Sequence, residues 1–561
     1  MRRAWRRRVE FVLSAAGALA FLAACGETHD SGGSRDAGSS DARSGGGQGG
    51  QVETGGASAG GQIGVGGNGV GGNGAGGSPT SSGGVAADGG PGRSDSGSGV
   101  GGRNTDADTA GNASDGGVAS EDGDYLVAID TPTRTYLDHV HLLAGTTWRA
   151  DVNGLPAMAQ WENETHVTAV RIQRFSPGDV LTAAQVRAFL PITAPASRSL
   201  DVTAAPYRAA ASPADATAAI QSALADAATM ADSSHPVDVV IPSGTFDYDA
   251  VLEVGANVRL RGAGGTLHAT DATVSAVHLG GDRSGALFLT ITAPATSRAT
   301  TPDSGGIWVG ARTASGAAVH GTLVVGNEIN GVAGAHVFAI QENGGLWAFN
   351  YAHDGYADTF HHTGQSNYCQ VVGNRAQTSA TRGDDLYAFV GYAGDGDPVH
   401  HCTCIANWGR DGAARGLSAV GGGFISFSDN DIARTQWAGI YIARESSYQT
   451  YGSFDVSVFG NQVADANLGG SHDGLLAYAD DPTDSASSKT FGSVSNAVQN
   501  LVVNDNSFTD TSAGVGNGFG IEVRSSVDTG QVIGNTVTHA KAPGIVVDGT
   551  GFTVSSNTFT P

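Results

Sequence analysis

Residues 357–392 read ADTFHHTGQSNYCQVVGNRAQTSATRGDDLYAFVGY and contain one pattern twice. The segments ADTFHH and DDLYAF align as the same strand on two successive passes of the chain, and SNYCQVVGN is the strand between them. A turn at Asn374 closes that intermediate strand, because an Asn side chain bonds locally and tolerates a sharp change of direction. The pattern brings Asp358, Asp384 and Asp385 into one small region, which makes them candidates for acid–base chemistry.

The strand that ends in Asn recurs through the second half of the chain. Successive turn residues lie 22 to 24 positions apart in the shortest repeats and 45 apart in the longest, so the longer repeats contain insertions. A period of this size is typical of a solenoid, in which each repeat buries its apolar side on its neighbours. The turn residues are Asn327, Asn350, Asn374, Asn407, Asn430, Asn461, Asn506, Asn535 and Asn557.

Each repeat has apolar residues three and five positions before its Asn and two positions after it. Val458, Val456 and Val463 occupy these positions around Asn461. Alternation at two-residue spacing places such side chains on the inner face of a strand. A further strand follows about nine residues later, as in AGIYIA from Ala438. We therefore predict an all-β fold over residues 211–561, a single-stranded right-handed parallel β-helix with about ten coils.

This repeat resembles that of the pectin-lyase-like right-handed β-helix proteins, over roughly residues 210–561. DATAAIQSALADA, followed by a strand and IPSGTF, resembles the start of pectate-lyase-superfamily domains. The resemblance implies a capping helix that plugs the open end of the solenoid, where the first coil would otherwise expose its edge and its core. Residues 212–215, SPAD, predict the start of that helix through its cap and its proline. Its predicted apolar stripe is Ile220, Ala223, Leu224 and Ala227.

The first residues resemble a bacterial lipoprotein signal. A basic stretch, MRRAWRRR, precedes the apolar run FVLSAAGALAFLAA, which is typical of a signal peptide and short for a membrane span. The run ends at Leu22-Ala23-Ala24-Cys25, which resembles the lipobox. The resemblance implies that Cys25 is the lipidated N-terminus of an exported protein, held in the cell envelope at the outer membrane or the cell surface. Ordinary secretion with a chance cysteine is the alternative.

Two segments separate this signal from the predicted solenoid. Residues 26–122 consist largely of Gly, Ser, Asp and Asn, so they cannot bury enough apolar surface to fold, and they predict a disordered tether. Residues 123–210 contain a β-rich stretch and LTAAQVRAFL, which favours a short helix. We expect this part to be a small β-rich segment packed before the solenoid.

Charge and cysteine content narrow the possible partners. The formal net charge is −24, which excludes nucleic acid binding through a basic face. Cys369, Cys402 and Cys404 are expected to point into the core as small apolar residues, with a stacked Cys369–Cys402 disulfide as the alternative. A zinc site is not expected, because dry core strands offer no open geometry. We expect no cofactor; Asp395 and Asp397 could bind Ca²⁺, but two carboxylates are too few to support a site.

Alignment on the turn residues places Asp358, Asp385 and Arg415 in one column across three coils, with Asp384 beside it and His361 pointing outward. This column resembles the active site of polygalacturonase-type glycoside hydrolases. Their Asn-Thr-Asp motif falls on Asp358, and their Asp-Asp pair falls on Asp384-Asp385. Their Gly-His-Gly and Arg-Ile-Lys motifs fall on residues that read Ala-Arg-Gly and Tyr-Ile-Ala here. The acids therefore match, whereas the substrate-binding His, Arg and Lys of that family do not.

The acids have an expected role and a competing structural interpretation. Three carboxyl groups in one patch cannot all ionise freely, so the pKa of at least one should rise. We expect Asp384 and Asp385 to be the general acid and base, with Asp358 assisting and Arg415 binding or tuning. The competing interpretation is an aspartate ladder with a salt bridge. The candidate substrate-binding residues are His361, Arg415, Tyr392 and Tyr441.

Residues 391–400, 444–454 and 479–499 leave the repeat after the same strand of their coils. Long loops at one position predict the walls of a cleft, and their tyrosines suit the faces of sugar rings. The sequence thus favours a surface-tethered enzyme acting on a polysaccharide, a glycoside hydrolase rather than a lyase. The alternatives are a polysaccharide lyase or epimerase, and a non-catalytic glycan-binding or adhesive β-helix.

The lipoprotein interpretation is tested by replacing Cys25 with Ser. The variant should lose its lipid and appear as a soluble product, because no acceptor thiol remains at the cleavage point. Membrane fractionation with immunoblotting measures this. If the variant stays in the membrane fraction to the same extent as the parent protein, the interpretation is wrong.

Overall fold

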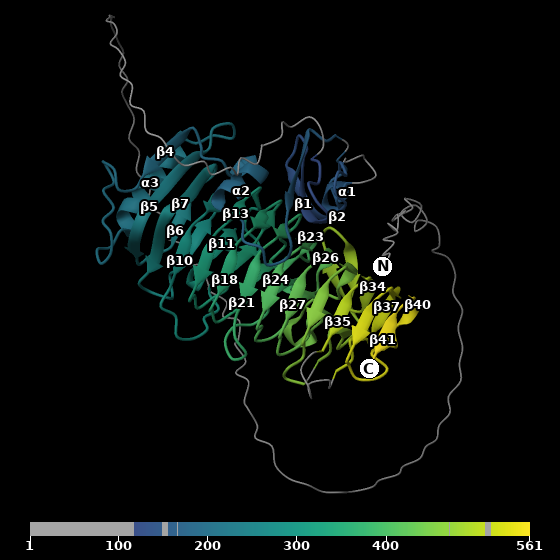
Figure 1. The fold of residues 1–561 in the computed structure, drawn as a ribbon. Coiled ribbons are helices and arrows are strands. Elements are labelled where there is room, and N and C mark those ends of the chain that lie inside the picture. Colours follow the sequence, from purple (N-terminus) through teal and green to yellow (C-terminus); the bar gives the residue numbers. More distant parts are fainter. Residues whose placement is uncertain (1–116, 149–154, 165, 471, 511–517) are drawn as a thin grey trace, which may run out of the picture. The chain divides into compact units, whose positions relative to one another are not determined.

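The computed structural model describes residues 117–148, 155–164, 166–470, 472–510 and 518–561 (Figure 1). All of them belong to the compact unit of residues 103–561. Cys25 and residues 26–116 of the predicted tether lie outside the described residues. The predicted end of the tether at residue 122 is too late, because Val118 already forms a bridge with Thr147. Among the described residues, no helix has both the length and the apolar character needed to cross a membrane.

Each full coil contributes three short strands, two flanking the turn Asn and one that follows it. The strands before the Asn are β13 (Leu323–Val325), β17 (Leu346–Ala348), β20 (Gln370–Val372), β23 (His400–Ile405), β26 (Gly423–Ser428), β29 (Phe454–Phe459), β34 (Val498–Asn504), β37 (Val527–Ile533) and β40 (Thr550–Ser555). The strands after it are β14 (Glu328–Asn330), β18 (Tyr351–His353), β21 (Arg375–Gln377), β24 (Trp408–Arg410), β27 (Asp431–Ala433), β30 (Gln462–Ala464), β35 (Ser507–Thr509), β38 (Thr536–Thr538) and β41 (Thr558–Thr560).

Both sets of strands belong to one 23-stranded sheet. Its remaining strands come from the first coils: β4 (Arg198–Asp201), β5 (Val237–Tyr248), β7 (Val258–Ala269), β9 (Gly285–Leu287) and β10 (Thr290–Thr292). Figure 1 shows β10, β18, β21, β24, β27 and β35 following one another along the solenoid.

The third strands of the coils form a separate parallel sheet of 11 strands. They are β6 (Leu252–Val254), β8 (Val277–Leu279), β11 (Ile307–Gly310), β15 (Val337–Ile340), β19 (Phe360–Thr363), β22 (Tyr387–Val390), β25 (Leu417–Val420), β28 (Ile440–Arg444), β31 (Leu475–Ala479), β36 (Ile521–Val523) and β39 (Ile545–Val547). Eleven strands agree with the predicted number of about ten coils. Parallel pairing of equivalent strands on successive coils confirms the predicted right-handed parallel β-helix.

The nine turn asparagines stack in one continuous ladder. Asn374 donates from its backbone nitrogen and its Nδ2 to Oδ1 of Asn407 at 2.8 and 3.0 Å, and Nδ2 also donates to the carbonyl of Trp347 at 2.9 Å. The same side-chain bonds join every step of the ladder, from the first Asn to the last. Eight of the nine are buried. The predicted register is therefore confirmed.

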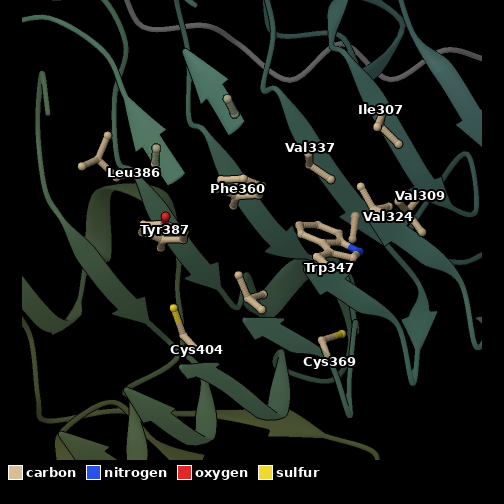
Figure 2. Packing of buried hydrophobic residues seen from close by; sticks show 14 of the residues in the cluster. Ile307, Val309, Val324, Val337, Trp347, Phe360, Cys369, Leu386, Tyr387 and Cys404 are labelled. Carbon is tan, nitrogen blue, oxygen red and sulfur yellow. The ribbon is translucent and has the colours of Figure 1, made fainter. Parts of the chain in front are cut away.

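The interior of the solenoid is apolar and continuous. Val456, Val458 and Val463 are buried, as the alternation predicts. Figure 2 shows side chains from successive coils, such as Phe360 and Tyr387, packed in the same core. Their rings stack with centroids 5.2 Å apart. At roughly 25 cal/mol per Å² of buried apolar surface, such packing is the main force that holds coil on coil.

Helix α3 (Thr217–Met230) carries the predicted apolar stripe, and its four residues are buried in the core cluster of the first coils. The predicted start of the helix was wrong. Ala216 precedes the first turn without a side-chain cap, while the hydroxyl of Ser212 donates to Asp247. The first coil also begins before residue 211, because β4 pairs with β5.

The N-terminal segment forms a three-stranded antiparallel sheet with two short helices. Its elements are β1 (Gly123–Asp130), β2 (Thr135–Leu142), α1 (Ala157–Trp161), β3 (Ala169–Arg174) and α2 (Ala183–Phe189). It packs against the flank of the solenoid and not before it, because Leu126 and Leu137 share a core cluster with Val325 and Val372. The backbone nitrogen of Leu137 also donates to Oε1 of Gln370 at 2.9 Å.

The ladder predicts a difference between two Asn→Ala substitutions. Asn407→Ala removes the acceptor of two buried donors on Asn374, which should lower the free energy of unfolding by about 1–3 kcal/mol. Asn557→Ala removes the same contact at the half-buried end of the ladder, where water replaces it, so the loss should be smaller. Chemical unfolding of both variants measures this, and equal losses would contradict the ladder account.

Candidate active site

The candidate site begins as a column of residues that precede the third strand of three coils. Phe360 in β19, Tyr387 in β22 and Leu417 in β25 are in register. Asp358, Asp385 and Arg415 lie two residues before each of these, so the predicted column is present. Local sequence explains the placement, because Phe, Tyr and Leu turn into the core and leave the preceding residues at the corner of the coil.

Two carboxylates of this column tie one coil to the next. Oδ1 of Asp358 accepts a hydrogen bond from the backbone nitrogen of Asp385 at 3.0 Å, and Oδ1 of Asp385 accepts one from the backbone nitrogen of Arg415 at 3.0 Å. Oδ2 of Asp385 accepts from the hydroxyl of Ser418 at 2.7 Å and from the guanidinium of Arg415 at 3.4 Å. The side chain of Asp385 is only 6% exposed. An aspartate ladder with a salt bridge therefore exists here.

Asp384 lies beside the ladder and is the most exposed of the three acids, with 26% of its side chain exposed. Its Oδ2 accepts a hydrogen bond from Nη1 of Arg298 at 2.6 Å. Arg298 lies on the segment between β10 and β11, which precedes the acids by several coils. Sequence reasoning missed Arg298, because it occupies no repeat position and carries no motif.

The environment shifts the pKa values of Asp384 and Asp358 in opposite directions. Burial and the neighbouring charges of Asp358 and Asp385 raise the pKa of Asp384 to about 7, against the opposing effect of Arg298. Burial would also raise the pKa of Asp358, but His361, Arg298 and the backbone nitrogen of Asp385 hold it below its usual value. One carboxyl group therefore keeps a proton near neutral pH while its neighbour is ionised.

The structure corrects part of the predicted substrate-binding set. Tyr441 is fully buried, and its hydroxyl donates to Oε1 of Glu445 at 2.8 Å, so it positions a neighbour and does not reach a ligand. Arg415 lies 4.0 Å from the centroid of the Tyr441 ring and pairs with Glu445 at 2.6 Å. Glu445 was missed, because it follows β28 in an insertion where the repeat gives no register.

His361 and Tyr392 lie at the edge of the same group of acids. Nδ1 of His361 is 2.7 Å from Oδ2 of Asp358, and the residue is 7% exposed. Tyr392 is half-buried at the start of the first insertion. Burial and the charges of Asp358, Asp395 and Glu445 raise the pKa of Tyr392.

The three insertions contact one another, as their common position predicts. Tyr392 forms a bridge with Thr450, and the hydroxyl of Tyr451 donates to the carbonyl of Ser487 at 2.9 Å. Asp397 accepts from the hydroxyl of Ser488 at 2.6 Å, and its second oxygen accepts from Thr490. A cleft between the insertions stays a prediction.

Two groups of acids in this region offer oxygen atoms that could bind a cation, the three acids of the site and the Asp395–Asp397 pair. Asp358, Asp384 and Asp385 each offer an oxygen, and these atoms lie within 4.8 Å of one another. Oxygen ligands suit Ca²⁺. Here Arg298 and Arg415 already supply positive charge, so the group does not need an ion. Asp397 of the predicted Asp395–Asp397 pair uses both carboxylate oxygens in contacts within the insertions.

Comparison with protein-family models finds no match to this chain, and comparison with curated proteins finds none either. Among solved structures, the chain is similar to the A-module of the mannuronan C-5 epimerase AlgE6 of Azotobacter vinelandii. The identity is 17%, the TM-score 0.42, and the match covers 64% of this chain and 99% of that one.

Two further solved structures are similar at the same level. For the family 28 exopolygalacturonase of Yersinia enterocolitica the identity is 12%, the TM-score 0.46, and the coverage 78% of this chain and 94% of that one. For the tailspike protein of Escherichia coli bacteriophage HK620 the identity is 13% and the TM-score 0.47, and the match covers 64% of this chain and 66% of that one. The fold is assigned from the strand topology, and the function must come from the site.

The ladder predicts that Asp385→Asn lowers stability. The amide would face the hydroxyl of Ser418 and remove one of the two charge partners of Arg415, which keeps Glu445, so the free energy of unfolding should fall by about 1–3 kcal/mol. Thermal unfolding of the purified protein measures this. An unchanged melting temperature would show that Asp385 does not support the column.

Proposed function

We propose that the protein is a carbohydrate-active enzyme that hydrolyses a glycosidic bond in a polysaccharide by general acid–base catalysis. The observation that carries the proposal is the cluster of three carboxyl groups at one corner of the solenoid, in which Asp358 and Asp385 are held by backbone hydrogen bonds and Asp384, the most exposed of the three, lies beside them. Asp384 retains a proton near neutral pH and is the more exposed group, whereas Asp358 is ionised. Two carboxyl groups in these states are what glycoside hydrolysis requires.

In this proposal Asp384 is the general acid. Its proton passes to the glycosidic oxygen as the bond between that oxygen and the anomeric carbon breaks. Water attacks the anomeric carbon and gives its proton to Asp358, the base. Arg298 holds the Asp384 carboxyl in place through the 2.6 Å hydrogen bond. Its positive charge also keeps the pKa of Asp384 from rising further.

The base assignment differs from the expectation drawn from the sequence. Asp385 was expected to share the acid–base pair with Asp384. Both of its oxygens are engaged by Arg415 and Ser418, and its side chain is 6% exposed, so we assign it a positioning role. Both oxygens of Asp358 are engaged as well, by the backbone nitrogen of Asp385 and by His361 at 2.7 Å, but its side chain is 15% exposed, and on this greater exposure we assign it the base.

Exposed aromatic rings near the acids support a sugar substrate. Trp437 is 38% exposed and packs against Arg415, with 5.0 Å between the guanidinium carbon and the ring centroid. Tyr448, in the second insertion, is 64% exposed. Rings of this kind stack on the apolar faces of sugars. We further propose that Cys25 and the residues that follow it tether the enzyme to the cell envelope.

Elimination, epimerisation and non-catalytic glycan binding are the alternatives. Elimination needs a base beside a neutralised sugar carboxylate, and the guanidinium groups of Arg298 and Arg415 are both paired with acids. A protonated Asp384 favours donation to a leaving oxygen and therefore hydrolysis. Binding without catalysis would use the acids only as a ladder, which leaves the raised pKa of Asp384 without a role.

The proposal predicts that Asp384→Asn removes about 10²–10⁴-fold of turnover on whichever glycan of a broad panel the parent protein cleaves. Asp411→Asn is the matched control. The carboxylate of Asp411 pairs with Arg434, at a distance of 2.6 Å, and accepts from Gln377, so it has partners of its own outside the acid cluster. This variant should keep full turnover. Reducing-end release measures both. Full turnover in Asp384→Asn would end the assignment.

Measuring turnover and melting temperature at several pH values, in the parent protein and in Asp384→Asn, separates a catalytic role of Asp384 from a structural one. The folded pKa of Asp384 is raised from 3.8 to about 7, so its contribution to stability is present at low pH and is lost as pH rises through 7. Turnover of the parent protein should therefore fall above about pH 7 as the acid loses its proton. Asp384→Asn removes the ionisation and should melt no lower than the parent protein at pH 8. A marked loss of melting temperature would instead favour the structural ladder.

A further inference from the structure

A second group of ionisable side chains lies inside the solenoid, on the opposite side of β19 from the acids. Glu342 from β16 (Glu342–Asn343), His362 from β19 and Cys369 are each 0% exposed. Nε2 of His362 lies 3.2 Å from Oε2 of Glu342, and Sγ of Cys369 lies 3.6 Å from the same oxygen. Carboxylate, imidazole and thiol atoms thus converge on one point in the core.

The Glu342 carboxylate is fixed so that one oxygen stays available. Its Oε1 accepts hydrogen bonds from the hydroxyl of Thr322 and from the indole nitrogen of Trp347. Oε2 faces His362 and Cys369. Outer hydrogen bonds that hold a ligand in this way are typical of metal sites, where they set the orientation of the carboxylate.

The imidazole ring of His362 is fully buried among aromatic rings. Its ring stacks on Trp347 with centroids 3.7 Å apart and on Phe389 at 5.2 Å. Among the described residues, Nδ1 has no hydrogen-bond partner, and Nε2 faces Oε2 of Glu342 at 3.2 Å without the geometry of a hydrogen bond. Buried imidazole nitrogens are normally bonded, so this ring aims an unused nitrogen at the carboxylate and the thiol.

Two of the three separations between the ligand atoms fit a tetrahedral ion, and all three atoms lie within 4.8 Å of one another. Zinc-to-ligand distances of 2.0–2.3 Å place oxygen and nitrogen ligands about 3.3 Å apart and oxygen and sulfur ligands about 3.6 Å apart. The observed separations are 3.2 and 3.6 Å. Cys402 lies beside Cys369 on the next coil, because Gln370 pairs with Thr403. Its thiol is not among the ligand atoms that lie within 4.8 Å of one another, so its side chain would have to turn toward the other three to serve as a fourth ligand.

The Glu342 carboxylate is fully buried. A divalent ion bound at its Oε2 would neutralise its charge and would bind the Cys369 thiol as thiolate.

We propose that Glu342, His362 and Cys369, completed by Cys402, bind a divalent transition-metal ion of the zinc class inside the solenoid. The ion would join three neighbouring coils and fix β19, whose outer face carries His361 against Asp358. The expectation that core strands offer no open geometry applies to His362 in β19, whereas Cys369 precedes β20 and Glu342 belongs to the separate two-stranded sheet of β12 (Val319–His320) and β16.

The test uses the full chain carrying Cys25→Ser, which removes the one cysteine outside the solenoid. The protein is unfolded with a chelator and refolded with Zn²⁺ or with Co²⁺. We expect about one equivalent of retained metal by elemental analysis, and a thiolate-to-cobalt charge-transfer band. Less than a tenth of an equivalent from either ion would overturn the proposal.

Matched cysteine variants locate the site. Cys369→Ser should lose the charge-transfer band and most of the metal. Cys404→Ser should keep both, because Sγ of Cys404 contacts the ladder amides of Asn407 and Asn430 instead. If Cys369→Ser does not fold, His362→Gln replaces it with the same expected loss. Retention of metal by both variants would overturn the site. The proposal would also be overturned if protein refolded with Zn²⁺ retains no metal and contains a Cys369–Cys402 disulfide. Intact mass measured without reductant detects that disulfide.

Discussion

The buried amide ladder is the interaction on which the rest of the structure depends. Along the ladder, the side-chain Nδ2 of one Asn donates to Oδ1 of the Asn on the next coil, as Asn374 does to Asn407. A strand shifted by one residue would turn its apolar side chains outward, and a coil shifted along the axis would leave the amides unpaired in a dry core. The ladder therefore fixes both the height and the rotation of every coil that follows it.

That register gives the acids their chemistry. Asp358 and Asp385 also link successive coils, because the carboxylate of each accepts a hydrogen bond from a backbone nitrogen of the next coil. Asp384 keeps a proton because it is buried and because the neighbouring carboxyl groups, on coils that cannot slide, cannot separate to relieve their repulsion. Ladder and acid–base pair are thus two properties of one column. Asp385 stabilises the column, while Asp384 is the group whose proton is available.

The sequence predicted the parts of the structure that repeat. The turn residues, the inward valines and the Asp358–Asp385–Arg415 column all follow from offsets within a coil, which close contacts between neighbouring coils preserve. Partners that do not repeat were missed, because nothing local marks them. Arg298 reaches Asp384 from a loop several coils earlier, and Glu342 looks like an ordinary polar residue until the fold buries it. The flank position of the N-terminal segment was missed for the same reason, since it depends on a patch that only the assembled coils expose.

The most direct test of the central claim is the protonation state of Asp384. Infrared difference spectra between the parent protein and Asp384→Asn, recorded across pH, isolate the carbonyl band of that one protonated carboxyl group. Crowding of fixed carboxyl groups predicts a band that persists from acidic pH and disappears with a midpoint of about 7. A midpoint near 4, the ordinary value for aspartic acid, would contradict the account.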